Sequence, residues 1–174
     1  MSQDRIKQLL HTRMQDPGIV ESGIKGVQFF KVTNAMECAP AIYEPTAIAI
    51  VSGTKEAIVQ GKRYRYDATR YMCCPMSMPV EAGTPDASPE KPILGVLVSL
   101  DTKVLTEMTI EMESALGAFR QPRGAAHPEG MTLARWDDSF TDAVLRLVQL
   151  GENPADIAVL GESRLREFYY ALLK

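Results

Sequence analysis

The sequence predicts an α+β protein in which a β-sandwich or β-barrel comes first and a helical region follows. Two patterns predict this order. Before about residue 101, apolar residues often alternate and turn signals recur at short intervals, whereas after it apolar residues follow a helical period. The chain has 174 residues, which is enough for one domain with a sizeable core, or for a domain with an appendage.

The first part predicts one short helix and then a series of short strands. The helix covers 3–14 and ends at Asp16-Pro17-Gly18, which are turn-forming residues. A hairpin is expected around Gly61, and the polar stretch GTPDASPEKP over 83–92 predicts an exposed loop. Strands at this spacing are typical of a sandwich or barrel. They are predicted over 27–32, 47–51, 57–60, 62–66, 70–74, 78–82 and 93–100.

The second part predicts four helices, and a loop over 121–130 separates the first from the second. Asp101 or Thr102 is the expected cap of the first helix, and Asn153-Pro154 opens a short third helix. The last helix reaches Lys174 without a glycine cap or a polar tail, so we expect the chain to be part of something longer. The four helices are predicted over 102–116, over 139–150, after Pro154, and through Leu165, Phe168, Tyr169, Leu172 and Leu173.

Charge and metal-ligand content argue against several classes of function. The net charge is −3, whereas proteins that grip nucleic-acid phosphates usually carry a basic domain or a dense basic stripe. No apolar run is long enough to cross a membrane. His11 and His127 lie far apart, and no HxH, HExxH or CxxC spacing occurs. We therefore expect no metal site, no cofactor and no membrane contact.

The stretch GKRYRYDATRYMCC, residues 61–74, is the candidate functional region. In a strand, Tyr64 and Tyr66 share one face while the neighbouring arginines share the other, which is typical of a half-buried strand rather than a nucleic-acid surface. Tyr64, Tyr66, Tyr71 and one of Cys73 or Cys74 are therefore candidates for the wall of a ligand pocket, and ordinary core packing is the alternative for each. The odd number of cysteines indicates free thiols in a reducing cytoplasm.

These residues resemble the N-terminal region of a group of AraC-type bacterial transcription regulators. The resemblance extends over essentially the whole chain, and the order and spacing of its parts are more specific than any one part. Its elements are Tyr43-x-Pro45, Gly53-x-Lys55, Gly61, Tyr66-Asp67-x-x-x-Tyr71, Pro79-Val80, Ala87-Ser88-Pro89-Glu90-x-Pro92 and the helix VLGESRLREFYYALL over 159–173.

The resemblance implies a cupin-like double-stranded β-helix barrel with an N-terminal arm over 1–100, and a helical dimerisation and linker region over 101–174. It also implies helix-turn-helix motifs after residue 174, so DNA would be contacted outside this chain. The expected function is effector sensing or dimerisation in a cytoplasmic regulator. Its expected partners are an unknown small-molecule effector and a second copy of the chain, and no catalysis is expected.

Candidate roles for individual residues follow from this hypothesis. Tyr64, Tyr66, Tyr71 and Cys73 are the candidate ligand-binding residues. The apolar stripes on 102–116 and 139–150 are candidates for dimer contact, with packing against the barrel as the alternative. Residues 1–26 are candidates for an arm that covers the barrel mouth, through Ile6, Leu9, Leu10 and Ile19.

Two other functions remain open. One is a thiol-based sensor of electrophiles or oxidants through Cys73 or Cys74, which would require a thiolate of lowered pKa. The other is a metal-free, cupin-type sugar isomerase or epimerase, which would require a general base and acid in the barrel. The available acid–base groups are the tyrosines and four glutamates, which are more simply interpreted as solvated surface or turn residues: Glu37, Glu44, Glu56 and Glu81.

Overall fold

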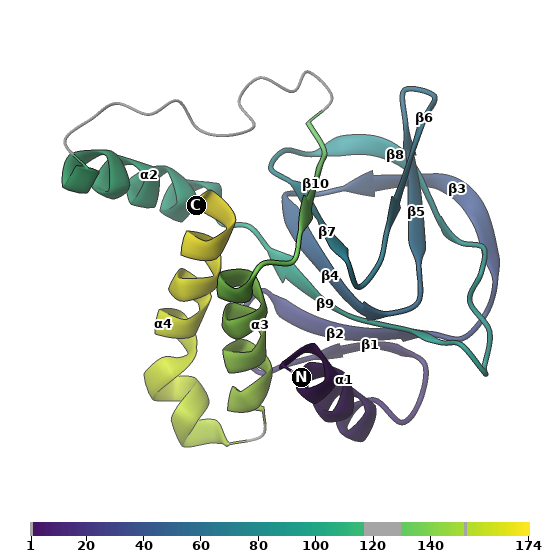
Figure 1. Ribbon diagram of the computed structural model, residues 1–174, viewed down its shortest axis with the longest axis horizontal. Coiled ribbons are helices and arrows are strands. Elements are labelled where there is room, and N and C mark those ends of the chain that lie inside the picture. The colour runs from purple at the N-terminus through teal and green to yellow at the C-terminus, as the bar shows by residue number, and fades with distance from the viewer. Residues whose placement is uncertain (1, 117–129, 152) are drawn as a thin grey trace.

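The computed structural model describes residues 2–116, 130–151 and 153–174, in which ten strands form two antiparallel sheets beside four helices (Figure 1). The six-stranded sheet has the spatial order β1 (Gly18–Glu21), β2 (Val27–Val32), β9 (Ile93–Ser99), β4 (Thr46–Ser52), β7 (Arg70–Cys74), β10 (Thr132–Arg135). The four-stranded sheet has the order β3 (Met36–Tyr43), β8 (Met78–Thr84), β5 (Lys55–Val59), β6 (Lys62–Tyr66). The helices are α1 (Ser2–Arg13), α2 (Thr102–Leu116), α3 (Asp138–Leu150) and α4 (Pro154–Leu173).

The two sheets face each other and enclose the core of a cupin-like barrel. Side chains at alternate positions of β4, β5, β6 and β7 point into it, among them Ile48, Ala57, Tyr66 and Met72. Gly95 lets the strands approach, because a Cβ there would lie 2.5 Å from Cζ of Phe30. The predicted α+β fold with a barrel in the first part is therefore confirmed.

The outer face of the six-stranded sheet carries a second core, against which three helices pack (Figure 1). Residues of β4, β7 and β9 that point away from the barrel meet buried side chains of α1, α3 and α4. Phe140 of α3 lies at the centre, with its ring 3.7 Å from that of Tyr71 on β7 and 5.5 Å from that of Phe168 on α4. The six-stranded sheet thus separates the barrel core from the helical layer.

The N-terminal segment packs differently from the expected arm. Ile6 and Leu10 are fully buried in the helix-side core, where α1 contacts α3 and the outer face of β4 and β9. Ile19 is largely exposed on β1. The expectation that these residues cover the barrel mouth is wrong, because the apolar face of α1 is already used on the opposite side of the six-stranded sheet.

Most predicted elements are present, with a few differences at particular places. The predicted third and fourth helices form one helix, α4, which begins at Pro154 behind the Asn153 cap. Strands β1, β3 and β10 were not predicted. Of the stripe on 102–116, only Met108 is buried, whereas the stripe of α3 is largely core. The expected loop over 121–130 lies outside the described residues, apart from Gly130.

Candidate functional site

Two of the predicted site residues, Tyr64 and Tyr66, lie on the barrel face of β6. The hairpin that presents them turns at Gln60 and Gly61, which both have positive φ, as a two-residue type I′ loop requires. Tyr66 is fully buried, and its hydroxyl lies 3.2 Å from that of Tyr43 on β3. Burial first, and Tyr43 second, raise the pKa of Tyr66 well above its usual value, so the hydroxyl of Tyr66 stays protonated at neutral pH.

The other two predicted residues, Tyr71 and Cys73, point to the opposite face of β7. The ring of Tyr71 stacks on Phe140, with an interplanar angle of 11°. Cys73 packs against the same helix-side core, whereas Met72 and Cys74 point into the barrel. The structure therefore brings Tyr64 and Tyr66 together in the barrel and separates them from Tyr71 and Cys73. A role of these four residues in ligand binding remains a prediction.

The environment of the adjacent thiols opposes the thiol-sensor alternative. Burial, and then the neighbouring Cys74, raise the pKa of Cys73 to about 11. Burial also raises the pKa of Cys74, whose Sγ lies 3.0 Å from the backbone oxygen of Met76. Reactive thiols have lowered pKa values, so these two are held in their unreactive, protonated form at neutral pH.

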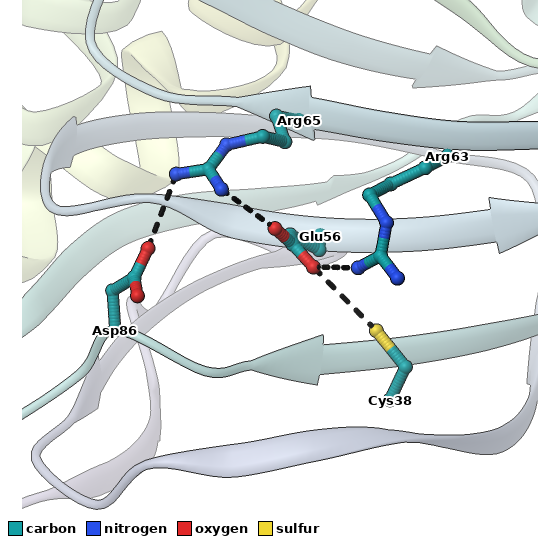
Figure 2. Close-up of polar contacts among 5 residues, drawn as sticks. All are labelled: Cys38, Glu56, Arg63, Arg65 and Asp86. Carbon is teal, nitrogen blue, oxygen red and sulfur yellow. Dashed lines mark hydrogen bonds and ion pairs between the residues drawn. The ribbon is translucent and has the colours of Figure 1, made fainter.

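Glu56 on β5 organises the outer side of the β5–β6 hairpin (Figure 2). Its carboxylate accepts hydrogen bonds from Arg63 and, at 2.8 Å, from Arg65, and the thiol of Cys38 lies 4.0 Å from Oε2. Arg65 also reaches Asp86 at 3.1 Å. Glu56 is only 3% exposed, so its interpretation as a solvated residue is wrong. The sequence contained a signal for this pairing, because a hairpin about Gly61 places Glu56, Arg63 and Arg65 on one face.

A cleft of about 510 Å³ opens between β6 and β10, which we call the basic cleft. Both strands are edges of their sheets, so the two sheets leave a seam at this place. The rim carries Lys62, Arg63, Arg65 and Arg70. The floor consists of Tyr64, Met131 and Leu133, which also pack in the barrel core, and Thr132 completes the lining.

Two larger or comparable hollows lie along α4, and their charges are mixed. One of about 930 Å³ lies between residues 23–26, α2 and α4, where Lys25 and Arg166 alternate with Asp101, Glu107 and Glu162. The other, of about 470 Å³, lies between α2 and α4 and contains Glu111, Arg166 and Glu167. Of these three hollows, the basic cleft alone has charged side chains of a single sign.

The described residues contain no group of three or more His, Cys, Asp or Glu side chains arranged to hold a metal ion. In the same part of the chain, the helices are too short or too polar to cross a membrane. The barrel core contains no carboxylate among the described residues, since Glu56 lies in the outer cluster and Glu81 is exposed on β8. General acid–base chemistry inside the barrel would therefore have only tyrosines and thiols available.

Solved structures with similar folds come from ToxT of Vibrio cholerae. The apo form matches with a TM-score of 0.57 and 10% identity, over 85% of this chain and 54% of that chain. ToxT with a bound unsaturated fatty acid matches with a TM-score of 0.52 and 10% identity, over 91% and 55%. ToxT bound to a methylnaphthalenyl-butenoic acid matches with a TM-score of 0.50 and 9% identity, over 83% and 56%. The chain thus shares a fold with about half the length of these proteins.

The sequence itself matches a family model, although no curated protein sequence matches the chain. The model describes the N-terminus of AraC-type transcriptional regulators, and the match covers residues 23–174. It includes strands β2 to β10 and helices α2 to α4, but not α1 or β1. The chain therefore belongs to the family of AraC-type transcriptional regulator N-termini and is a regulatory domain of that kind.

Proposed function

We propose that this domain senses a small-molecule effector at its barrel and reports it, through the helical layer, to a DNA-binding part of a longer protein. The match covers only about half of the ToxT chains, and we propose that DNA is contacted by residues beyond this chain. A transcription regulator acts where the DNA is, so we place the bacterial protein in the cytoplasm. We assign it no catalytic residue and no cofactor.

The observation that carries this proposal is the position of β7 between the two cores. Met72 and Cys74 touch the barrel interior, while Tyr71 and Cys73 touch the helices. Side chains on opposite faces of one strand move with the same backbone. An effector that shifts β7 from the barrel side therefore also shifts Tyr71 and its stacking partner Phe140.

The contacts continue from β7 to the end of the chain. Phe140 packs on Phe168 of α4, and the hydroxyl of Tyr169 donates to the backbone oxygen of Ser99 at 2.9 Å, at the end of β9. The backbone N–H of Asp101 in turn donates to that hydroxyl at 3.1 Å. α4 is thus linked to two strands of the six-stranded sheet: to β9 by the hydrogen bond of Tyr169, and to β7 through Phe140. A ligand can shift the equilibrium between two arrangements of these elements only to the extent that it binds one arrangement more tightly than the other.

A thermal-shift screen with metabolites tests effector binding. A ligand at a hundred times its Kd stabilises the folded state by about 2.7 kcal/mol, and in a chain of this size each kcal/mol raises Tm by roughly 2–4 °C. We expect one organic class to raise Tm. Failure of every class in the screen, for both this domain and the full-length regulator, would sink the sensor proposal.

Hydrogen exchange then tests transmission to α4. With a hit from the screen, we expect exchange in α4 to slow in the natural protein but not in Tyr71→Leu, which keeps an apolar side chain and loses the aromatic stack. Tyr170→Leu is the matched control, because Tyr170 lies on α4 and is 43% exposed. Equal slowing in Tyr71→Leu would contradict the role of β7.

We also propose that the domain forms a homodimer through α2. Ile110 and Leu116 are 58% and 59% exposed on this helix, and a hollow separates it from α4. Light scattering at increasing concentration measures the oligomeric state. Ile110→Asp should shift the dimer toward monomer, whereas Val159→Asp, at an exposed apolar position on α4, should not.

A further inference from the structure

We propose that Cys74, Met76 and Met78, at the connection between β7 and β8, bind a copper(I) ion. We call these three residues the sulfur cluster. The site goes beyond the proposed function, because it takes a soft metal ion and not the organic effector that the thermal-shift screen seeks. The inference follows from the way the sulfur atoms converge, from the exposure of one of them, and from the charge that copper(I) brings.

The two thioethers of the sulfur cluster meet beside a glycine. Gly130 has a positive φ of 74° and carries no side chain. From the position that a Cβ on this residue would occupy, Sδ of Met76 lies 3.2 Å away and Sδ of Met78 lies 3.5 Å away. The two sulfur atoms therefore border the same small space, although their residues follow different parts of the chain connection.

Cys74 brings a thiol to the same end of the barrel. It is the last residue of β7, and its side chain packs in the barrel core together with Met78. Its Sγ lies 3.0 Å from the backbone oxygen of Met76. The hydroxyl of Ser77 donates to the carboxylate of Glu44 at 2.6 Å, which ties the connection to the end of β3. The sequence Cys-x-Met-x-Met over 74–78 is thus held as one local group.

Met76 gives an ion access to the buried sulfur atoms. Methionine often fills gaps in a core, and the nearly buried Met78 can be interpreted in that way. Met76 is 55% exposed, yet its Sδ borders the same space as that of Met78. Methionine is unbranched and has three rotatable bonds, so both side chains can close on an ion with little movement of the backbone.

The ligand set selects copper(I) among the common metal ions. Thiolates and thioethers are soft ligands and favour copper(I), whereas magnesium and calcium require oxygen ligands and zinc is usually bound by cysteine, histidine and carboxylates. We expected no metal site because histidine pairs and CxxC spacings are absent, and that argument does not concern thioethers. The sequence alone does not show that Met76 and Met78 turn their sulfur atoms toward one another.

The charge of the bound state also fits the barrel. A copper(I) ion with one thiolate and two neutral thioethers carries no net charge, so it can lie at the end of an apolar core at little cost. A divalent ion with the same ligands would keep one positive charge. The barrel core has no carboxylate among the described residues that could balance this charge.

Binding releases one proton from Cys74. Burial raises the pKa of this thiol, so the sulfur is protonated before the ion arrives. When the copper–sulfur bond forms, the S–H bond breaks and the proton passes to water, because a thiol that coordinates a metal ion is deprotonated. Copper stays in its reduced state throughout. The thiol also gives up its contact with the backbone oxygen of Met76.

The first test measures affinity by competition with a coloured copper(I) chelator, without oxygen, on the 174-residue domain. Loss of a group that only orients a metal ligand costs roughly 10–100-fold, so Met76→Leu should weaken binding at least about tenfold. Met36→Leu should leave it unchanged. This matched control is 54% exposed and lies at the opposite end of β3 from Tyr43, the partner of Met78. Equal affinity of Met76→Leu and the natural protein, or equal affinity for zinc(II), would overturn the inference.

The second test concerns the thiol. Cys74→Ala should weaken copper(I) binding at least about tenfold. Cys73→Ala is the matched control and should not, because the side chain of Cys73 packs on the opposite face of β7. If Cys74→Ala does not fold, as judged by its thermal transition, Met78→Leu decides instead, since it keeps an apolar side chain and loses only the sulfur. Full affinity in the folded variant would overturn the inference.

The third test locates the ion. Copper(I) is diamagnetic, so methyl NMR of isotope-labelled methionines can follow it. The signals of Met76 and Met78 should shift on binding and that of Met36 should not, and X-ray absorption should show only sulfur neighbours. Nitrogen or oxygen neighbours, or unchanged signals of Met76 and Met78, would overturn the inference. An organic hit in the thermal-shift screen together with no copper(I) binding would overturn this site and leave the proposed function intact.

Discussion

Glu56 illustrates how much a single side chain depends on its strand partner. A carboxylate that is nearly buried must be paired, because an isolated charge in the protein interior is very costly. Here the partners lie directly across the hairpin, where Glu56 is opposite Arg65. Inspection of each glutamate by itself cannot distinguish this residue from the exposed Glu81. Only the register about Gly61 contains that information.

The first prediction concerns the stability that this carboxylate provides. Glu56→Gln removes the charge that accepts hydrogen bonds from Arg63 and Arg65, so we expect a loss of about 1–3 kcal/mol in the free energy of unfolding, measured by urea denaturation. Glu81→Gln on the neighbouring strand is the control and should change it by less than about 0.5 kcal/mol. Similar midpoints for the two variants would mean that the cluster in Figure 2 contributes little to stability.

The second prediction concerns alkaline pH. The pKa of Cys73 is raised from 9.0 to about 11 in the folded protein, so the folded state holds this proton more tightly than the unfolded state. Its contribution is fully present below pH 9 and is lost as the pH rises toward 11, at up to about 1.4 kcal/mol per pH unit. Cys73→Val lacks this titration, so its urea midpoint should fall less steeply over that range. Parallel pH profiles would contradict this assignment.

At the scale of whole elements, the missed strands share one property. β1, β3 and β10 are edge strands, each hydrogen-bonded to a single neighbour. The residues of β1 are all exposed, and most of those in β3 are too, so no apolar alternation marks them. Central strands such as β4 and β9 bury both faces and read as continuous apolar runs. Hydrophobic pattern therefore predicts the interior of a sheet better than its edges.

Hydrophobic pattern was also of limited use in predicting the candidate site. The alternation in β7 shows that Tyr71 and Cys73 share one face and that Met72 and Cys74 share the other. Both faces are apolar, because β7 lies between two cores. The sequence therefore cannot indicate which face lines the barrel. β6 has an apolar and a charged face, and for this reason its inward residues, Tyr64 and Tyr66, could be predicted correctly as inward-facing.

The third prediction concerns the start of α3. Asp137 caps this helix, and its side chain accepts a hydrogen bond from the backbone N–H of Phe140 at 2.8 Å. Asp137→Ala should lower the free energy of unfolding by about 1 kcal/mol. Asp138→Ala is the matched control, since this acid lies in the first turn without a capping bond and should cost only about 0.3 kcal/mol. Chemical denaturation of the two variants side by side decides between these outcomes.

At the scale of the molecule, the two cores share one sheet, so neither can be lost alone. Loss of the helical layer would expose the outer face of β4, β7 and β9, which is almost entirely apolar. Unfolding of the barrel would remove the surface on which the helices pack. We therefore expect the 174 residues to behave as one cooperative unit despite their two-part sequence pattern.

The fourth prediction tests this cooperativity with the single tryptophan. Trp136 packs edge-on against Phe140, at 4.9 Å between ring centroids, and so reports on the helical layer. Hydrogen exchange of the backbone amides of β5 and β6, followed at increasing urea concentration, reports on the barrel. The two signals should give the same urea midpoint. Two separate transitions would show that the barrel and the helical layer unfold independently.

The two-sided burial of β7 also constrains how the lengths of related chains can vary. Deletion of one residue within a strand moves every following side chain to the other face. In β7 this would send tyrosine and cysteine positions into the barrel and methionine toward α3. A deletion in the exposed part of the loop, at residues 89–91, would meet no such penalty. Among natural relatives, insertions and deletions should therefore gather in that loop and at the chain ends, while the spacing between residues 66 and 74 stays constant.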